Sequence, residues 1–209
     1  AQALCREMGV SDAVAFDMGG TTAKAGVIHK GEALTAAAAL IGGYDHALPV
    51  QIPMIDIFEV GTGGGSIAWL DEGGALHVGP QSAGSEPGPI CYGRGGTQPT
   101  VTDALFMLGI LSPDEGFAGG GFRLCADGVR SAFAALGAQL GYGAEEAAYD
   151  CWRIVNANMT QGVRRTTAGK GIDPRELVML AYGGNGPAFA CVQAEELCID
   201  RVIVPKASP

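Results

Sequence analysis

The chain has 209 residues, 47% of them hydrophobic, and a formal net charge of -9 at pH 7. That is enough for the core of one globular domain, alone or with a side lobe. The negative charge and the lack of a basic stripe argue against a nucleic-acid partner, because a phosphate backbone would be repelled. No apolar run reaches the length of about 18 residues needed for a membrane span, and no signal peptide is recognisable, so the cytoplasm is the expected compartment.

The N-terminal part of the sequence predicts a meander of strands. Residues 12–18 form a nearly unbroken apolar run that ends in a Gly-Gly turn, and residues 23–29 and 32–40 follow as further strand candidates. The turns between these runs are short, which favours antiparallel pairing.

Glycine-rich loops and then helices are predicted for the middle of the chain. Residues 67–70 and 75–78 flank the turn sequence Asp-Glu-Gly-Gly and predict a hairpin. Three helices are expected beyond Pro99. The first is capped by Thr102 or Asp103, the second by Asp127, and a longer third helix begins at Glu145 and Glu146.

The C-terminal part alternates between strand and helix. A buried strand over 177–182 is followed by a glycine turn, a helix over 187–197 and a last strand over 201–204. We expect these strands to run parallel and to join the sheet of the N-terminal meander, which gives a mixed α/β sheet with flanking helices.

One candidate site is the loop after the first strand. Asp17 ends the strand, Gly19 and Gly20 allow a ligand to approach the backbone, and Thr21 and Thr22 add hydroxyl groups. Such a loop can hold phosphate oxygens with its amides while the carboxylate binds a hydrated Mg²⁺. The alternative is an ordinary glycine hairpin in which the aspartate forms an Asx turn.

A second candidate loop consists of Gly183, Gly184, Asn185 and Gly186, between a buried strand and a helix. Free amides at a helix N-terminus attract anions or the edge of a nucleotide. The spacing is neither that of a dinucleotide-binding fingerprint nor that of a Walker loop. A plain strand-to-helix turn is the alternative.

Charged residues in or near the glycine-rich loops are candidates of second rank. Glu59, Arg94 and Asp103 could contact substrate or metal, but each could equally be a surface charge or a hydrogen bond that organises a loop. Lys24 could reach a phosphate, although a solvated strand lysine is the simpler interpretation.

The two glycine loops together resemble the second phosphate motif and the adenosine motif of the superfamily of actin, heat-shock chaperones and sugar kinases. Five further blocks resemble, in order, the hydantoinase A and 5-oxoprolinase family. They are Pro-Met-Ile-Asp at 53–56, Glu-Val-Gly-Thr-Gly-Gly-Gly-Ser-Ile-Ala at 59–68, Val-Gly-Pro-Gln-Ser-Ala-Gly at 78–84, Pro-Gly-Pro-Ile-Cys-Tyr-Gly-Arg-Gly-Gly at 87–96 and Pro-Thr-Val-Thr-Asp-Ala at 99–104.

The resemblance implies an actin-like ATPase lobe of the ribonuclease H-like class and an enzyme that uses ATP and Mg²⁺ to open a cyclic amide. Asp17 would hold the metal and serve catalysis with Glu59 and Asp103. Gly19, Gly20, Thr21 and Thr22 would hold the phosphates, and Gly183, Gly184, Asn185 and Gly186 would lie on the adenosine side. An ATP-dependent ketone carboxylase of the same family is one alternative, and a non-catalytic actin-like nucleotide-binding protein is another.

By the same resemblance, residues 1–209 correspond to the second lobe of the ATPase domain, with a glycine-rich insertion over about 53–120. The family has another lobe before this region and a further segment after it, and it acts with a hydantoinase B type subunit or domain. We therefore expect the isolated chain to bind nucleotide weakly and to have negligible activity. Many relatives carry a histidine shortly after the adenosine-type turn, where this chain has Phe189, which puts turnover in doubt.

Overall fold

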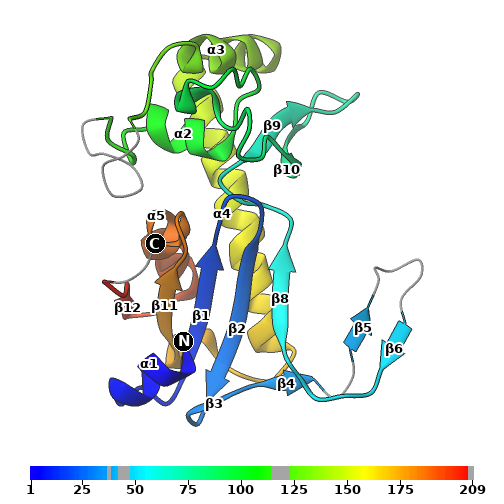
Figure 1. Ribbon diagram of the computed structural model, residues 1–209, viewed down its shortest axis with the longest axis vertical. Coiled ribbons are helices and arrows are strands. Elements are labelled where there is room, and N and C mark those ends of the chain that lie inside the picture. The colour runs from blue at the N-terminus through cyan, green and yellow to red at the C-terminus, as the bar shows by residue number, and fades with distance from the viewer. Residues whose placement is uncertain (37–38, 42–47, 114–122, 207–209) are drawn as a thin grey trace.

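The computed structural model describes residues 1–36, 39–41, 48–113 and 123–206. Figure 1 shows two lobes joined by one long helix, α4 (Ala144–Ala168), which runs through both. We call the part around the central sheet the sheet lobe, and the part that holds β9, β10, η1, α2 and α3 the cap lobe. No helix in the described part of the chain is long and apolar enough to cross a membrane.

The central sheet is mixed, with strand order β12-β11-β1-β2-β3 and with β8 also paired to β2. Strands β1, β11 and β12 run parallel, whereas β2 pairs antiparallel with β1, β3 and β8. The bounds are Ala13–Met18 for β1, Ala23–His29 for β2, Glu32–Ala33 for β3, Ile57–Val60 for β8, Val178–Tyr182 for β11 and Val202–Ile203 for β12. The predicted mixed α/β sheet with flanking helices is confirmed.

The third predicted strand was wrong in extent. Of residues 32–40, only the two residues of β3 join the sheet. Next, β4 (Thr35–Ala36) pairs with β7 (Met54–Ile55), and β5 (Ala39–Ile41) pairs with β6 (Leu48–Val50), while residues 37 and 38 lie outside the described residues. The chain leaves the sheet because β8 occupies the edge of β2 from Ala23 to Gly26.

Helices α2, α3 and α5 and the β9–β10 hairpin lie close to their predicted positions, and α1, η1 and η2 are additional short helices. Their bounds are Gln2–Glu7 for α1, Ser66–Leu70 for β9, Leu76–Ser82 for β10, Ile90–Tyr92 for η1, Val101–Met107 for α2, Val129–Leu140 for α3, Pro174–Glu176 for η2 and Gly186–Leu197 for α5. Two predicted caps were wrong. Thr100 caps α2, with Asp103 completing the capping box, and Gly128 precedes α3 in place of Asp127.

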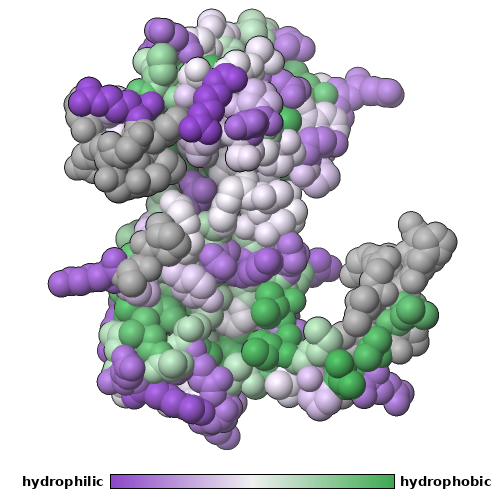
Figure 2. All heavy atoms as spheres, viewed as in Figure 1, coloured by the Kyte–Doolittle hydropathy of each residue, from purple (hydrophilic) through white to green (hydrophobic). Residues whose placement is uncertain are grey.

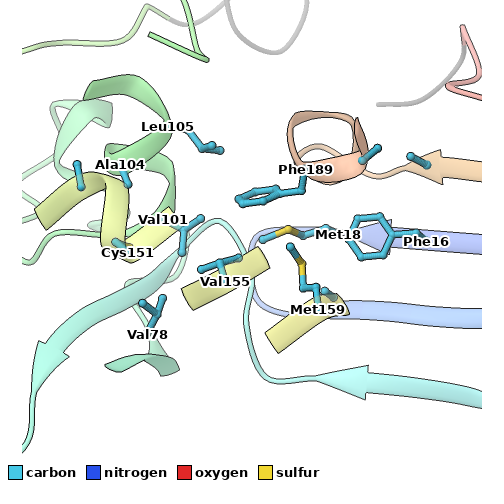
Figure 3. Packing of buried hydrophobic residues seen from close by; sticks show 14 of the residues in the cluster. Phe16, Met18, Val78, Val101, Ala104, Leu105, Cys151, Val155, Met159 and Phe189 are labelled. Atoms are coloured by element: carbon cyan, nitrogen blue, oxygen red, sulfur yellow. The ribbon is translucent and has the colours of Figure 1, made fainter. Parts of the chain in front are cut away.

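One hydrophobic core extends through both lobes. In Figure 3, Phe16 and Met18 of β1 meet Phe189 of α5, and the cluster continues to Leu105 of α2 and Val155 of α4. Because strand side chains alternate between faces, the burial of Phe16 and Met18 beneath the helices turns Asp17 to the opposite face of the sheet. On that face, α1 packs through Cys5 on Ala13, Ile28 and Leu180.

Candidate functional site

The two candidate loops lie side by side at one edge of the sheet. Strands β1 and β11 are neighbours in parallel register, with Asp17 beside Tyr182, so both strands end at the same level. The backbone amide of Asn185 donates to the Met18 carbonyl at 2.9 Å, and the Nδ2 group of the Asn185 side chain donates to the Gly19 carbonyl at 3.2 Å. The two loops therefore converge, as expected for the carboxyl ends of adjacent parallel strands.

A third loop, residues 61–65, braces the first one from the side. The Gly64 amide donates to the Gly19 carbonyl at 3.0 Å, and the Gly65 amide donates to the Gly20 carbonyl at 2.6 Å. A Cβ at Gly63 would stand 2.5 Å from backbone atoms of Thr21, so only glycine fits there. We call residues 61–65 the brace loop.

The brace loop is itself held by the start of α2. Both the amide and the hydroxyl of Thr102 donate to the Gly64 carbonyl, at 2.8 and 2.9 Å. Thr102 thereby connects the cap lobe to the loop after β1. The sequence analysis named Thr102 as a possible helix cap but did not predict its contact with Gly64. The one signal in the sequence was the place of Thr102 in the block at 99–104.

These contacts leave backbone amides of the loop without an acceptor in the described part of the chain. Its carbonyls at Gly19 and Gly20 are occupied by the brace loop, whereas within the described residues the amides of Gly20, Thr21 and Thr22 donate to no protein acceptor. No atom of the described residues lies within 4 Å of where a Cβ would stand at Gly19, Gly20 or Gly184. Free amides next to the open position at Gly20 are groups of the kind that bind phosphate.

Asp17 lies half-buried near the end of β1, with one carboxylate oxygen directly against Gly183. Burial and, to a lesser degree, the negative charge of Asp17 raise the pKa of the neighbouring Tyr182. The described residues contain no group of three or more His, Cys, Asp or Glu side chains that could hold a metal. Asp17 supplies one carboxylate, a ligand that Mg²⁺ accepts in combination with waters and phosphate oxygens.

The other predicted charged residues are not all brought to this place. Glu59 lies on β8, two strands from Asp17 and exposed on the same sheet face, whereas Arg94 is an exposed residue of the cap lobe. Asp103 is fully buried in the cap lobe. Its Oδ1 accepts from the Cys91 amide at 2.7 Å, and its Oδ2 accepts from Ile90 and Thr100.

Asp103 holds the surrounding backbone in place, because backbone amides and one hydroxyl group donate hydrogen bonds to its two carboxylate oxygens. The same cluster affects the nearby thiol. Burial, reinforced by the Asp103 charge, raises the pKa of Cys91 well above its usual range. Asp17 and Glu59 are thus the two predicted catalytic carboxylates that share a surface.

The fold and site define an α/β lobe in which two glycine loops meet where two parallel strands end. The model of the hydantoinase/oxoprolinase family matches residues 1–208. The chain belongs to the hydantoinase/oxoprolinase family.

Relatives and solved structures of that family are similar to nearly the whole chain. The uncharacterized protein MJ0964 of Methanocaldococcus jannaschii is 44% identical over 200 residues, covering 92% of this chain and 29% of its own length. The structure of the ATP-dependent caprolactamase of Pseudomonas jessenii superposes on this chain with a TM-score of 0.86 and is 35% identical in sequence. The nucleotide-free structure of acetone carboxylase superposes with a TM-score of 0.85 and is 30% identical. Each match covers 99% of this chain and 29% of the other. The chain therefore spans less than a third of the length of these relatives.

Proposed function

We propose that this chain is a nucleotide-binding lobe of an enzyme that uses ATP to open a cyclic amide. The observation that carries the proposal is the set of free amides at Gly20, Thr21 and Thr22, together with the open space at Gly20 and the Asp17 carboxylate on the strand that leads into this loop. The similarity to a caprolactamase described as ATP-dependent supports both the nucleotide and the class of substrate.

Each loop has a separate role in this proposal. The amides of 19–22 bind the phosphates, Asp17 holds Mg²⁺ through its coordinated waters, and the turn at 183–186 borders the adenosine. When bound, ATP supplies the phosphoryl group that activates an amide carbonyl oxygen, which would otherwise be a poor leaving group. The protein positions the phosphates and balances their charge.

Ketone carboxylation is the second candidate, because acetone carboxylase matches this chain about as well as caprolactamase does. The organic substrate would be bound largely by parts of the relatives that this chain does not cover. Among these we place another ATPase lobe and a hydantoinase B type subunit. The match to a caprolactamase subunit alpha supports a multi-subunit assembly.

The nucleotide part of the proposal is tested by titrating the chain with ATP and Mg²⁺ in a calorimeter. We expect weak binding that is lost in Gly20→Ala, because the added methyl fills open space above the loop without touching other protein atoms. Gly143→Ala is the matched control, since a Cβ there makes only an ordinary contact at the start of α4. Equal binding by wild type and Gly20→Ala would place the phosphates elsewhere.

The substrate class is tested in the full-length protein assembled with its partner subunit. We expect ADP release to be stimulated by a panel of lactams and hydantoins. Stimulation only by ketones with bicarbonate would support the carboxylase, and nucleotide binding without stimulation by either panel would support a non-catalytic role.

A further inference from the structure

Four side chains form a row across the open face of the sheet. Tyr182 of β11 stands beside Asp17 of β1, Asp17 stands opposite Lys24 of β2, and Lys24 stands opposite Glu59 of β8. Partners in register project to the same face of a sheet, with Cβ atoms about 5 Å apart in antiparallel pairs. Lys24 is therefore placed between two carboxylates, immediately below the loop at 19–22.

Lys24 is exposed, whereas its neighbours Ala23 and Ala25 are buried against the helices. It lines a groove of about 250 Å³ together with Asp17 and Tyr182. Figure 2 shows this face of the sheet lobe with a band of hydrophilic side chains above hydrophobic ones, and Ile55 and Ile57 are among the exposed apolar residues.

In the part of the chain that the structure describes, Lys24 forms no ion pair, although acidic residues flank it on both sides. Lys170 shows the contrasting case, because its Nζ lies 2.7 Å from Asp56 Oδ2. The Lys24 ammonium is thus free to bind a ligand that arrives at the loop.

The charges around the Lys24 ammonium favour a role in offsetting the negative charge of a bound ligand. The chain carries a net charge of -9, and both charged neighbours of Lys24 in the row are carboxylates. A triphosphate adds several negative charges to this place, and free amides and one divalent cation offset them only in part. Among the described residues that line the groove, Lys24 is the only lysine or arginine.

We propose that Lys24 is a phosphate-binding residue of this site and that its ammonium holds the terminal phosphate of the nucleotide. The inference rests on the proposed nucleotide site and adds a residue that distinguishes a triphosphate from a diphosphate. It replaces the simpler interpretation of Lys24 as a solvated strand lysine.

Lysine footprinting tests the inference directly, because the chain has only four lysines, Lys24, Lys30, Lys170 and Lys206. The chain is acetylated with acetic anhydride in the presence of Mg²⁺ and either tripolyphosphate, ATP, ADP or adenosine. We expect acetylation of Lys24 to fall severalfold with tripolyphosphate and ATP, less with ADP and not with adenosine. Acetylation of the exposed Lys30 should stay constant as an internal control.

Substitutions give a second readout that does not depend on enzyme activity. Lys24→Met should weaken ATP binding by about tenfold, the loss typical of one charge-assisted hydrogen bond, and leave ADP binding nearly unchanged. Lys24→Arg should retain most of the ATP affinity, and Lys30→Met should match the wild type. Circular dichroism verifies that each variant folds.

Hydrogen exchange of the loop amides distinguishes a failure of the Lys24 proposal from a failure of the proposed nucleotide site. If ATP slows exchange at residues 19–22 while Lys24 acetylation and Lys24→Met binding stay at wild-type levels, the role of Lys24 is refuted and the nucleotide site stands. If millimolar ATP changes neither exchange nor acetylation, both proposals fail for this chain.

Discussion

Gly183 lies directly against the carboxylate of Asp17, so that a methyl group on its Cα would overlap Asp17 Oδ1. The same methyl would stand 2.6 Å from the Met18 carbonyl oxygen. The two glycine loops therefore touch at Gly183, which has no side chain. The Asp17 carboxylate can take its position because Gly183 has no Cβ there.

Gly183→Ala should lower the free energy of unfolding by about 1–3 kcal/mol, because the residue has a φ of 81° and the new methyl would push against Asp17. Gly184→Ala is the matched control, since no atom of the residues that the structure describes lies within 4 Å of its Cβ position and no left-handed φ is required. Urea unfolding of both variants measures the difference. Similar stabilities would contradict the close packing of Gly183 on Asp17.

Asp103→Asn should destabilise the chain by about 2–4 kcal/mol, because backbone amides donate to both of its oxygens. Either orientation of the new amide places its NH₂ group against at least one of these backbone donors. Asp127→Asn, at an exposed position shortly before α3, should change stability by less than about 0.5 kcal/mol.

Nucleotide binding adds a second check on Asp103. If its role is to organise the cap lobe, Asp103→Asn at a temperature where it remains folded should bind ATP as the wild type does. A normal stability combined with lost binding would instead favour the second-rank interpretation of Asp103 as a residue of the site.

The parts of the fold that the sequence predicted depend on local patterns. The runs that became β1, β2 and β11 are apolar and end in glycine turns, so their positions followed from neighbouring residues. The third strand did not follow, because its place depends on competition with β8, which lies more than twenty residues further along the chain.

The brace loop shows most clearly what local patterns cannot predict. Gly63 is packed against the backbone of Thr21, whereas Gly20 faces open space, and the sequence gives both simply as glycine in a glycine-rich stretch. Likewise, the sequence shows that Asp103 is charged but not that its carboxylate is buried and that both oxygens accept hydrogen bonds. Only the contacts between distant segments distinguish glycines that pack from glycines that leave room for a ligand.

Thiol reactivity should separate buried from exposed cysteines. Burial raises the pKa of Cys151 to about 12, so at pH 8 about one thiol in ten thousand is present as the reactive thiolate. Cys191 and Cys198 are exposed. We expect iodoacetamide to label these two in the native chain and to label Cys151 only after unfolding, as followed by mass spectrometry. Rapid labelling of native Cys151 would contradict its place in the core.

Asp17→Asn in the full-length enzyme should reduce ATP-coupled turnover far more than it weakens ATP binding. The amides at 19–22 remain in place to hold the phosphates, but a neutral side chain cannot balance Mg²⁺ or orient an attacking group as a carboxylate does. Loss of an interaction that acts mainly in the transition state lowers turnover more than ground-state affinity. We expect a loss of about a hundredfold or more, comparable to removing one preorganised electrostatic group.

The measurement pairs calorimetric titration of ATP with steady-state ADP release by the same variant, reconstituted with its partner subunit. Glu59→Gln serves as the comparison, because Glu59 lies on the same sheet face two strands away and should have a smaller effect if Asp17 is the residue that holds the metal. Near-normal turnover in Asp17→Asn would show that Asp17 only shapes the turn beside Gly183. The catalytic carboxylate would then be Glu59, if Glu59→Gln is inactive, or would lie in a part of the enzyme that this chain does not cover.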